Sequence, residues 1–199
     1  MKKILLAIDA TNLNINSLDF ACFLGRLTKS KITGVFLENL VAEEKPVLKS
    51  LQGAAYIDWM VDENSDEHKD KMEAIKKNIA FFKEGCINRQ TQYEVHREGG
   101  VPLSEVIEES RFADALIVDA ETSFSKHFES IPTGFIKDVL KKAECPVILA
   151  PENFEAIDEI AFTYNGSSSS VFAIKQFTYL FPELKEKKVR IIQVNEKGE

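Results

Sequence analysis

Short apolar runs, separated by stretches with helical spacing, are the feature that most limits how this chain can fold. The runs are KILLAI (3–8), KITGVFL (31–37), TQYEVHR (91–97), DALIV (114–118) and CPVILA (145–150). Nearly continuous runs of this length are typical of strands buried on both faces, and the alternating third run is expected nearer the sheet edge. Strands that alternate with helices predict an α/β fold with a doubly wound, Rossmann-like parallel sheet of five strands.

Helical spacing is clearest between the second and third runs. The apolar face there consists of Met72, Ile75, Ile79, Phe82 and Cys86. This period predicts a long amphipathic helix. The preceding segment, residues 38–70, has little periodicity and holds nine acidic and three basic side chains. We expect it to be a loop with short helical pieces that serves as a flap or a partner surface.

Composition and charge exclude several classes of protein. The net charge is −7 and no basic stripe is present, which argues against nucleic acid as a partner. No apolar run approaches the roughly 18 residues that cross a bilayer, so no membrane partner is expected. The three cysteines are far apart and the three histidines form no ligand cluster with them, so no metal site is predicted. An odd, sparse set of cysteines fits a reducing compartment, and we expect a cytoplasmic protein.

The layout of the first strand and turn recurs near the end of the chain. EIAFTYNGSSSS (159–170) follows the pattern of KILLAIDATNLN (3–14), and KVRIIQV (188–194) parallels the second strand. We therefore predict a first domain over 1–152 and an incomplete second copy, strand, helix and strand, over 157–199. Such a fragment buries too little apolar area to fold alone. It is expected to pack on the CPVILA strand or on a second chain.

Four segments carry a family resemblance in order and at suitable spacing. They are ILLAIDAT, REGGVP, ADALIVD and GFIKDVLKKAECPVILAPE. Over residues 1–151 the chain resembles the universal stress protein family, and the later restart resembles the tandem form with a truncated second copy. The resemblance implies an adenine-nucleotide-hydrolase-like fold, association as a homodimer or tandem pair, and a stress-responsive regulatory role without established catalysis. It does not identify the protein partner.

The resemblance also implies where a nucleotide would bind. Nucleotide-binding members have an acidic residue after the first strand, and Asp9 matches it. After the fourth strand they have a loop of the form G-x-x-G, nine residues, then G-S or G-T. The candidate site residues in this sequence are Asp9, Ala10, Thr11, Leu37, Ala120, Ser123, Thr133 and Gly134. Thr133 is also the expected N-cap of the helix that follows.

None of the three loop glycines is retained in this register. Glycine lets backbone N–H groups approach a phosphate closely, whereas Ala or Thr adds a Cβ. Asp119 and Glu121 would each repel a triphosphate by on the order of 1 kcal/mol near a surface. ATP or another adenine nucleotide is therefore expected to bind weakly or not at all.

Three functions remain open at this point. The leading prediction is a non-catalytic stress-response module that acts through dimer or partner contacts. The alternative is a nucleotide-binding switch with a modified phosphate loop, for ATP or AMP. An enzyme is the third reading, and we do not expect one because no constellation of base, nucleophile and metal is visible.

Overall fold

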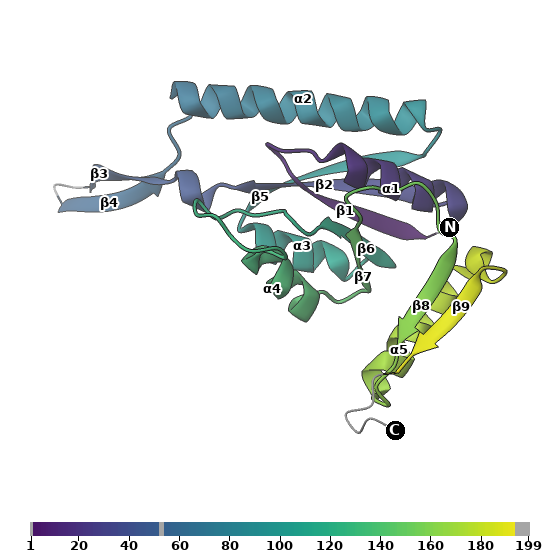
Figure 1. Cartoon of the computed structure of the whole chain (residues 1–199). Coiled ribbons are helices and arrows are strands. Elements are labelled where there is room, and N and C mark those ends of the chain that lie inside the picture. Colours follow the sequence, from purple (N-terminus) through teal and green to yellow (C-terminus); the bar gives the residue numbers. More distant parts are fainter. Residues whose placement is uncertain (1, 52–53, 194–199) are drawn as a thin grey trace.

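The computed structural model describes residues 2–51 and 54–193, and its centre is a parallel sheet of five strands (Figure 1). The strands are β1 (Lys3–Asp9), β2 (Lys31–Asn39), β5 (Tyr93–Gly100), β6 (Ala115–Asp119) and β7 (Val147–Ala150). Their order is β5-β2-β1-β6-β7, and every neighbouring pair is parallel. The predicted α/β fold with a five-stranded parallel sheet is confirmed. The strand order reverses between β1 and β6.

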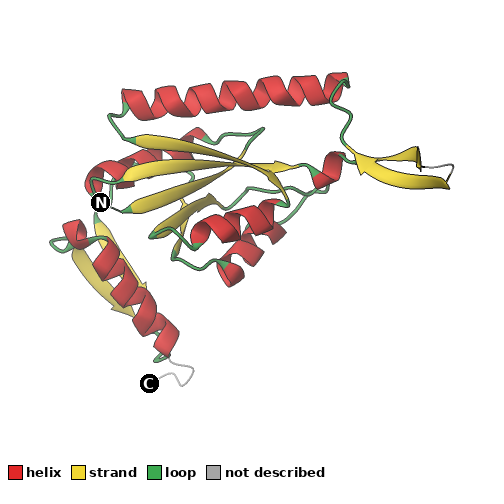
Figure 2. Cartoon of the chain, turned by 180° about the vertical axis from the view of Figure 1, so that it is seen from behind, coloured by secondary structure: helices red, strands yellow, loops and turns green. Residues whose placement is uncertain are grey.

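Helices cover both faces of this sheet (Figure 2). They are α1 (Ile15–Leu27) and α2 (Asp66–Asn88) on one face, and α3 (Pro102–Ser110) and α4 (Gly134–Lys142) on the other. In β1, Ile4, Leu6 and Ile8 join the core beneath α1 and α2. Leu5 and Ala7 join the core beneath α3 and α4. All five side chains are at most 4% exposed, which explains why the run is apolar without alternation.

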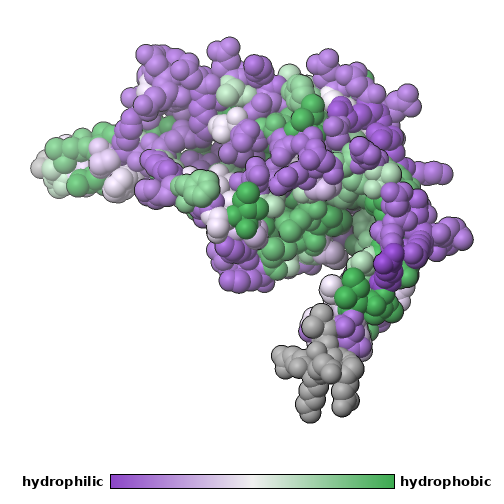
Figure 3. Space-filling view, viewed as in Figure 1, coloured by the Kyte–Doolittle hydropathy of each residue, from purple (hydrophilic) through white to green (hydrophobic). Residues whose placement is uncertain are grey.

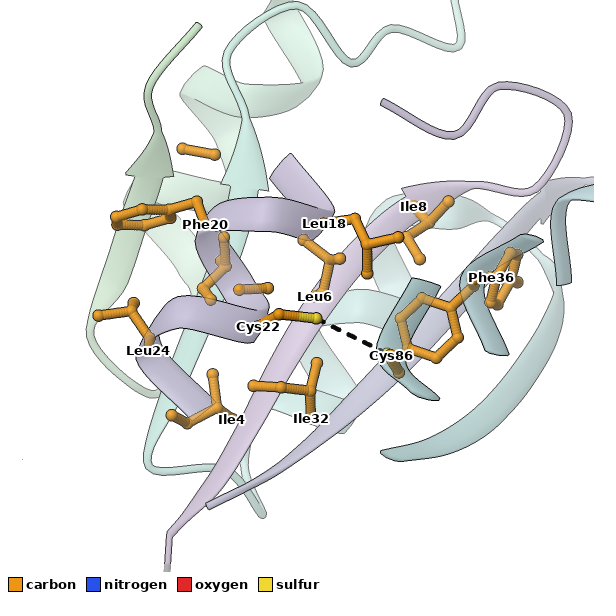
Figure 4. Packing of buried hydrophobic residues seen from close by; sticks show 14 of the residues in the cluster. Ile4, Leu6, Ile8, Leu18, Phe20, Cys22, Leu24, Ile32, Phe36 and Cys86 are labelled. Atoms are coloured by element: carbon orange, nitrogen blue, oxygen red, sulfur yellow. Dashed lines mark hydrogen bonds between the residues drawn. The ribbon is translucent and has the colours of Figure 1, made fainter. Parts of the chain in front are cut away.

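The core between the sheet and the first pair of helices is closely packed (Figure 4). Cys22 of α1 and Cys86 of α2 are both fully buried there, with sulfur atoms 3.9 Å apart. Phe82 packs edge-to-face on Phe36, with ring centroids 5.6 Å apart. Its ring lies over Gly34 of β2, where an added Cβ would come within 2.7 Å of a ring carbon. The missing side chain at Gly34 thus sets how closely α2 approaches the sheet.

The segment 38–70 differs from its prediction as a loop with short helical pieces. A short 3₁₀ helix, η1 (Val41–Glu43), leads into an antiparallel hairpin of β3 (Lys45–Leu51) and β4 (Ala54–Met60). The hairpin projects from the body of the domain (Figure 1). We call it the arm. Whether the segment acts as a flap stays a prediction.

The two faces of the arm differ in chemistry. Cross-strand pairing places Leu48 opposite Ile57 on the same face as Trp59, and these side chains are 73%, 65% and 60% exposed. The other face carries Lys49 and Asp58, which form an ion pair at 2.6 Å. The strand prediction depended on apolar runs that become buried, so it missed a hairpin whose apolar face is exposed.

The C-terminal unit consists of β8 (Glu159–Thr163), α5 (Ser168–Leu180), the 3₁₀ helix η2 (Pro182–Leu184) and β9 (Lys188–Ile192). Its two strands are parallel and form a separate sheet. The strand–helix–strand order matches the expectation from the sequence. The domain boundaries and the interpretation as half of a second copy stay predictions.

The C-terminal unit meets the main domain beside the CPVILA strand, as expected, but without strand pairing: residues 145–148 and α5 residues that include Phe177 and Leu180 line one hollow. In the described chain β7 pairs with β6 and with neither β8 nor β9. Phe181 and Leu184 are buried in the same core cluster as the inner residues of α1, and Phe154, in the segment before β8, contacts Phe20 with ring centroids 5.0 Å apart. Lys2 also lies 5.7 Å from the centre of the Phe181 ring. Burial of Phe181 and Leu184 in the main core therefore holds the unit, without strand pairing to β7.

None of the described helices combines the length and apolar character needed to cross a membrane.

We expect Phe181→Ala to lower the free energy of unfolding by about 3 kcal/mol, because it empties a buried aromatic site. Phe181 is 5% exposed, whereas Phe172 on α5 is 60% exposed. Phe172→Ala is the matched control and should cost less than about 1 kcal/mol. Urea unfolding followed by circular dichroism measures both values. Equal effects would show that Phe181 does not hold the C-terminal unit to the domain.

Candidate functional site

The candidate site lies at the carboxyl ends of β1 and β6, where the strand order reverses. Open α/β sheets bind ligands at such reversal points because the loops that follow the two strands diverge. Asp9 ends β1 and Asp119 ends β6. Asn14, the N-cap of α1, donates from Nδ2 to Oδ2 of Asp119 at 2.6 Å. This hydrogen bond ties the two loops together across the reversal point.

The loop after β1 is held by hydrogen bonds within itself and by bonds from Ala10 to β2 and α2. Oδ1 of Asp9 accepts from the backbone N–H of Thr11 at 2.8 Å and from its hydroxyl at 2.7 Å. Ala10 is fully buried; its N–H donates to the carbonyl of Leu37, and its carbonyl accepts from Nδ2 of Asn78. Ala10 thus anchors the loop, while Asp9 and Thr11 face outward.

A hollow of about 650 Å³ opens beside this loop. Four of the predicted site residues line it: Asp9, Thr11, Leu37 and Ser123. The rest of its wall comes from the end of β2, η1, the base of the arm, the start of α2 and the loop after β6. The other four predicted residues do not line it. The structure therefore brings half of the predicted set to one cavity.

Acidic side chains outnumber basic ones around the hollow. The acids are Asp9, Glu38, Glu43, Glu44, Asp62 and Glu67, and the lysines are Lys45, Lys71 and Lys126. Glu43 pairs with Lys71 and lies 3.3 Å from Nδ1 of His68. Burial lowers the pKa of Lys71, while the carboxylates of Glu38 and Asp9 act in the opposite direction. The wall as a whole opposes a polyanion.

Glu38 is the most deeply buried acid of this wall, with a side chain 2% exposed. It is held by Arg97 of β5, whose guanidinium donates to both carboxylate oxygens. This hydrogen bond to Glu38 raises the pKa of Arg97. The pair fixes the end of β2 against β5 and gives the cavity a charged, desolvated floor.

In the loop after β6 an internal carboxylate takes the place expected for an anion. Oε1 of Glu129 accepts from the backbone N–H of Gly134, the first residue of α4, at 3.0 Å. Oε2 of Glu129 accepts from the Ser123 hydroxyl. The Ser123 hydroxyl, then the Gly134 N–H and the Lys137 ammonium, lower the pKa of Glu129. Free N–H groups at a helix start attract anions, and here the chain supplies one.

The remaining loop positions are also bonded to one another. Thr133 caps α4 by accepting from the N–H of Ile136 at 3.4 Å, so the predicted N-cap is confirmed. Its hydroxyl donates to the carbonyl of Thr122, and its N–H donates to the carbonyl of Ala120 at 3.3 Å. The fold thus gathers the four predicted loop residues, but their polar groups already bond to other groups of the loop and of the start of α4.

Sequence reasoning missed Glu129, Glu38 and Lys71. Glu129 lies five residues before Gly134 in an unremarkable polar loop, and nothing in that spacing indicates that it returns to the helix start. Glu38 begins the segment that was expected to be irregular, and Lys71 directly follows that segment. Only the folded loop and the start of α2 bring these charges to the site.

No protein-family model matches this sequence, and no curated protein matches it. Solved structures do match its fold. A universal stress protein from Archaeoglobus fulgidus DSM 4304 is 19% identical with a TM-score of 0.68, over 100% of this chain and 67% of that one. The hypothetical protein MJ0577 is 18% identical with a TM-score of 0.55, over 75% of this chain and 94% of that one.

A further universal stress protein from Archaeoglobus fulgidus is 18% identical with a TM-score of 0.50, over 76% of this chain and 99% of that one. At these identities the likeness concerns the fold. The chain has the fold of universal stress proteins, as the resemblance of its sequence predicts.

We expect the contact between Glu129 and Gly134 to stabilise the protein at neutral pH and to weaken in acid. The folded pKa of Glu129 lies below its ordinary value of 4.5, so its contribution is fully present above pH 4.5. It is lost as the pH falls through the lower, folded value. The Tm difference between the wild type and Glu129→Gln should therefore shrink below pH 4.5.

Differential scanning calorimetry between pH 7 and pH 3 measures this gap. Glu121→Gln is the control, because Glu121 is an exposed carboxylate of the same loop. A gap for Glu129→Gln that stays constant down to pH 3 contradicts the assigned contact.

Proposed function

We propose that this protein is a non-catalytic, universal-stress-type regulatory module that acts through contacts with a partner or with a second copy and binds ATP weakly or not at all. The observation that carries this proposal is the Glu129 carboxylate on the N–H of Gly134. A nucleotide phosphate that used the start of α4 would have to displace this carboxylate.

The internal carboxylate competes efficiently because it is part of the same chain. A tethered group has an effective concentration in the millimolar range or above, without loss of translational freedom. Ser123 strengthens it by donating to its second oxygen. ATP must displace Glu129 from the Gly134 N–H and from the Ser123 hydroxyl before its phosphates can bind to this loop. The competition supports weak ATP binding.

Charge supports the same conclusion. The hollow beside Asp9 is lined by twice as many acids as lysines, and two of its three lysines already form ion pairs, Lys45 with Glu67 and Lys71 with Glu43. A triphosphate brings several further negative charges into this field. Lys126 is the lysine of this wall for which the described residues offer no ion pair.

Exposed apolar surface supports action through contacts. Leu48, Ile57 and Trp59 form one exposed face of the arm, and the space-filling view shows the arm as largely hydrophobic (Figure 3). Contiguous apolar patches on a soluble domain commonly mark interaction sites. A two-stranded hairpin is also marginally stable alone, so a partner that covers this face would order it.

A nucleotide-binding switch is the second candidate function. The hollow of about 650 Å³ lies within the size range of small-molecule sites, roughly 300–1,000 Å³, and Asp9 and Leu37 line it. An adenine nucleotide, ATP or AMP, is the ligand class for this reading. Glu129 would then be a gate that the ligand displaces.

We expect ATP–Mg²⁺ to bind the wild type with a dissociation constant above about 10 μM. Glu129→Ala frees the N–H of Gly134 and should tighten binding at least about tenfold, because the competing carboxylate is gone. Isothermal titration calorimetry measures both affinities. Glu121→Ala is the matched control, since it removes one negative charge from the same loop without touching α4.

The outcomes separate the two functions. Wild-type binding tighter than about 10 μM refutes weak ATP binding and favours the switch. Equal gains from Glu129→Ala and Glu121→Ala would assign the effect to net charge and remove the role of the helix start. No gain from Glu129→Ala would show that Glu129 does not block the loop.

A further inference from the structure

His96 and Glu98 lie two residues apart on β5 and therefore on the same face of this strand. β5 is an edge strand that pairs with β2. Helix α3 packs over β2 and β5 and brings Glu109 to the same place. Val106, one turn earlier on α3, is fully buried, so the helix that carries Glu109 is fixed by the core.

The three side chains have the geometry of an incomplete metal-ligand set. Each offers one ligand atom, and these atoms all lie within 4.8 Å of one another. Nδ1 of His96 is 3.3 Å from Oε2 of Glu109. Zinc binds imidazole nitrogen and carboxylate oxygen at about 2.0–2.2 Å, which places tetrahedral ligands roughly 3.5 Å apart. Small side-chain rotations therefore suffice to bring all three atoms to one ion.

The electrostatics of this cluster favour a cation. Among the described residues, Lys3 and His96 lie within ion-pair distance of Glu109, and Lys31 and His96 lie within ion-pair distance of Glu94. No ion pair of the described residues involves Glu98. Burial raises the pKa of the neighbouring Glu105, and the negative charges of Glu98 and Glu108 raise it further. The negative charge of the carboxylates around His96 therefore exceeds the positive charge of the nearby side chains.

Lys3 is the group that a metal ion would replace. Its ammonium lies 3.4 Å from Oε2 of Glu109, and its side chain is 30% exposed. A lysine on a flexible stem can leave toward solvent at little cost. Glu109 then becomes free to bind the ion together with the imidazole of His96.

We propose that His96, Glu98 and Glu109 form a binding site for a divalent transition metal ion, with zinc as the best match. A mixed nitrogen and oxygen set differs from the all-oxygen sites of Mg²⁺ and Ca²⁺ and from the sulfur sites of soft ions. The three protein ligands leave a fourth position open to water or a ligand. The sequence predicted no metal site because its histidines are far from its cysteines, whereas the fold supplies carboxylates.

Zinc titration of the metal-stripped full chain against a chromophoric chelator tests the site. We expect one zinc per chain, with a dissociation constant tighter than about 10 μM. His96→Gln and Glu98→Gln should each weaken binding at least about tenfold. His127→Gln is the matched control, because it removes an exposed imidazole from the loop after β6 and should leave the affinity unchanged.

A fourth variant distinguishes a metal site from an ion-pair network. Lys3→Met removes the competing ammonium and should tighten zinc binding several-fold, whereas loss of a purely structural ion pair would not. Three results would overturn the proposal: weak binding of several ions per chain, equal affinity for magnesium, or full affinity in a folded Glu98→Gln variant. Circular dichroism establishes that each variant is folded.

Discussion

Burial of β1 on both faces is the constraint on which the rest of the structure depends. The even residues Ile4, Leu6 and Ile8 pack under one helix pair, and the odd residues pack under the other. A strand that is buried on both faces must lie inside the sheet. β1 accordingly has β2 on one side and β6 on the other, and this is the point where the strand order reverses. Ala10, which directly follows β1, is also fully buried, so the start of the loop is fixed. The neighbouring Asp9 is thereby held at the wall of the cavity. The site is therefore a consequence of the core.

The sequence predicts the parts of this protein whose cause is local or periodic. Continuous apolar runs located four strands of the sheet and an alternating run located the edge strand β5, and Thr133 was recognisable as a cap because a threonine before a helix has one dominant use. The arm escaped prediction because its apolar face is exposed, and the burial of Phe181 in the main core escaped it because its neighbour Lys2 lies at the other end of the sequence. Glu129 escaped because its partner, the Gly134 N–H, is a backbone group without any sequence signal. These three features depend on which parts of the folded chain come into contact, and the composition of the sequence does not specify such contacts.

Two parts of the molecule extend from the compact domain, and they are held differently. The arm has no contact that covers Leu48, Ile57 and Trp59 among the described residues, whereas the C-terminal unit buries Phe181 in the main core. The unit nevertheless leaves much of α5 and β9 exposed. Both parts thus present apolar surface at a distance from the Asp9 cavity. A protein that acts through contacts can use such surfaces independently of whether the cavity holds a nucleotide.

The departures from the family loop form one consistent local design. Where the family pattern has its third glycine, Thr133 has a side chain that caps α4 and bonds the loop at Thr122. Where the pattern has Ser or Thr, Gly134 has no Cβ, and a Cβ there would lie 2.8 Å from the Glu129 carboxylate. Ser123, in place of the second glycine, supplies the hydroxyl that bonds the other oxygen of Glu129. The exchanges at Ser123 and Gly134 add or accommodate a contact with the internal carboxylate, and the exchange at Thr133 holds the loop to the start of α4, so the loop is better described as built around an anion of its own than as a decayed phosphate site.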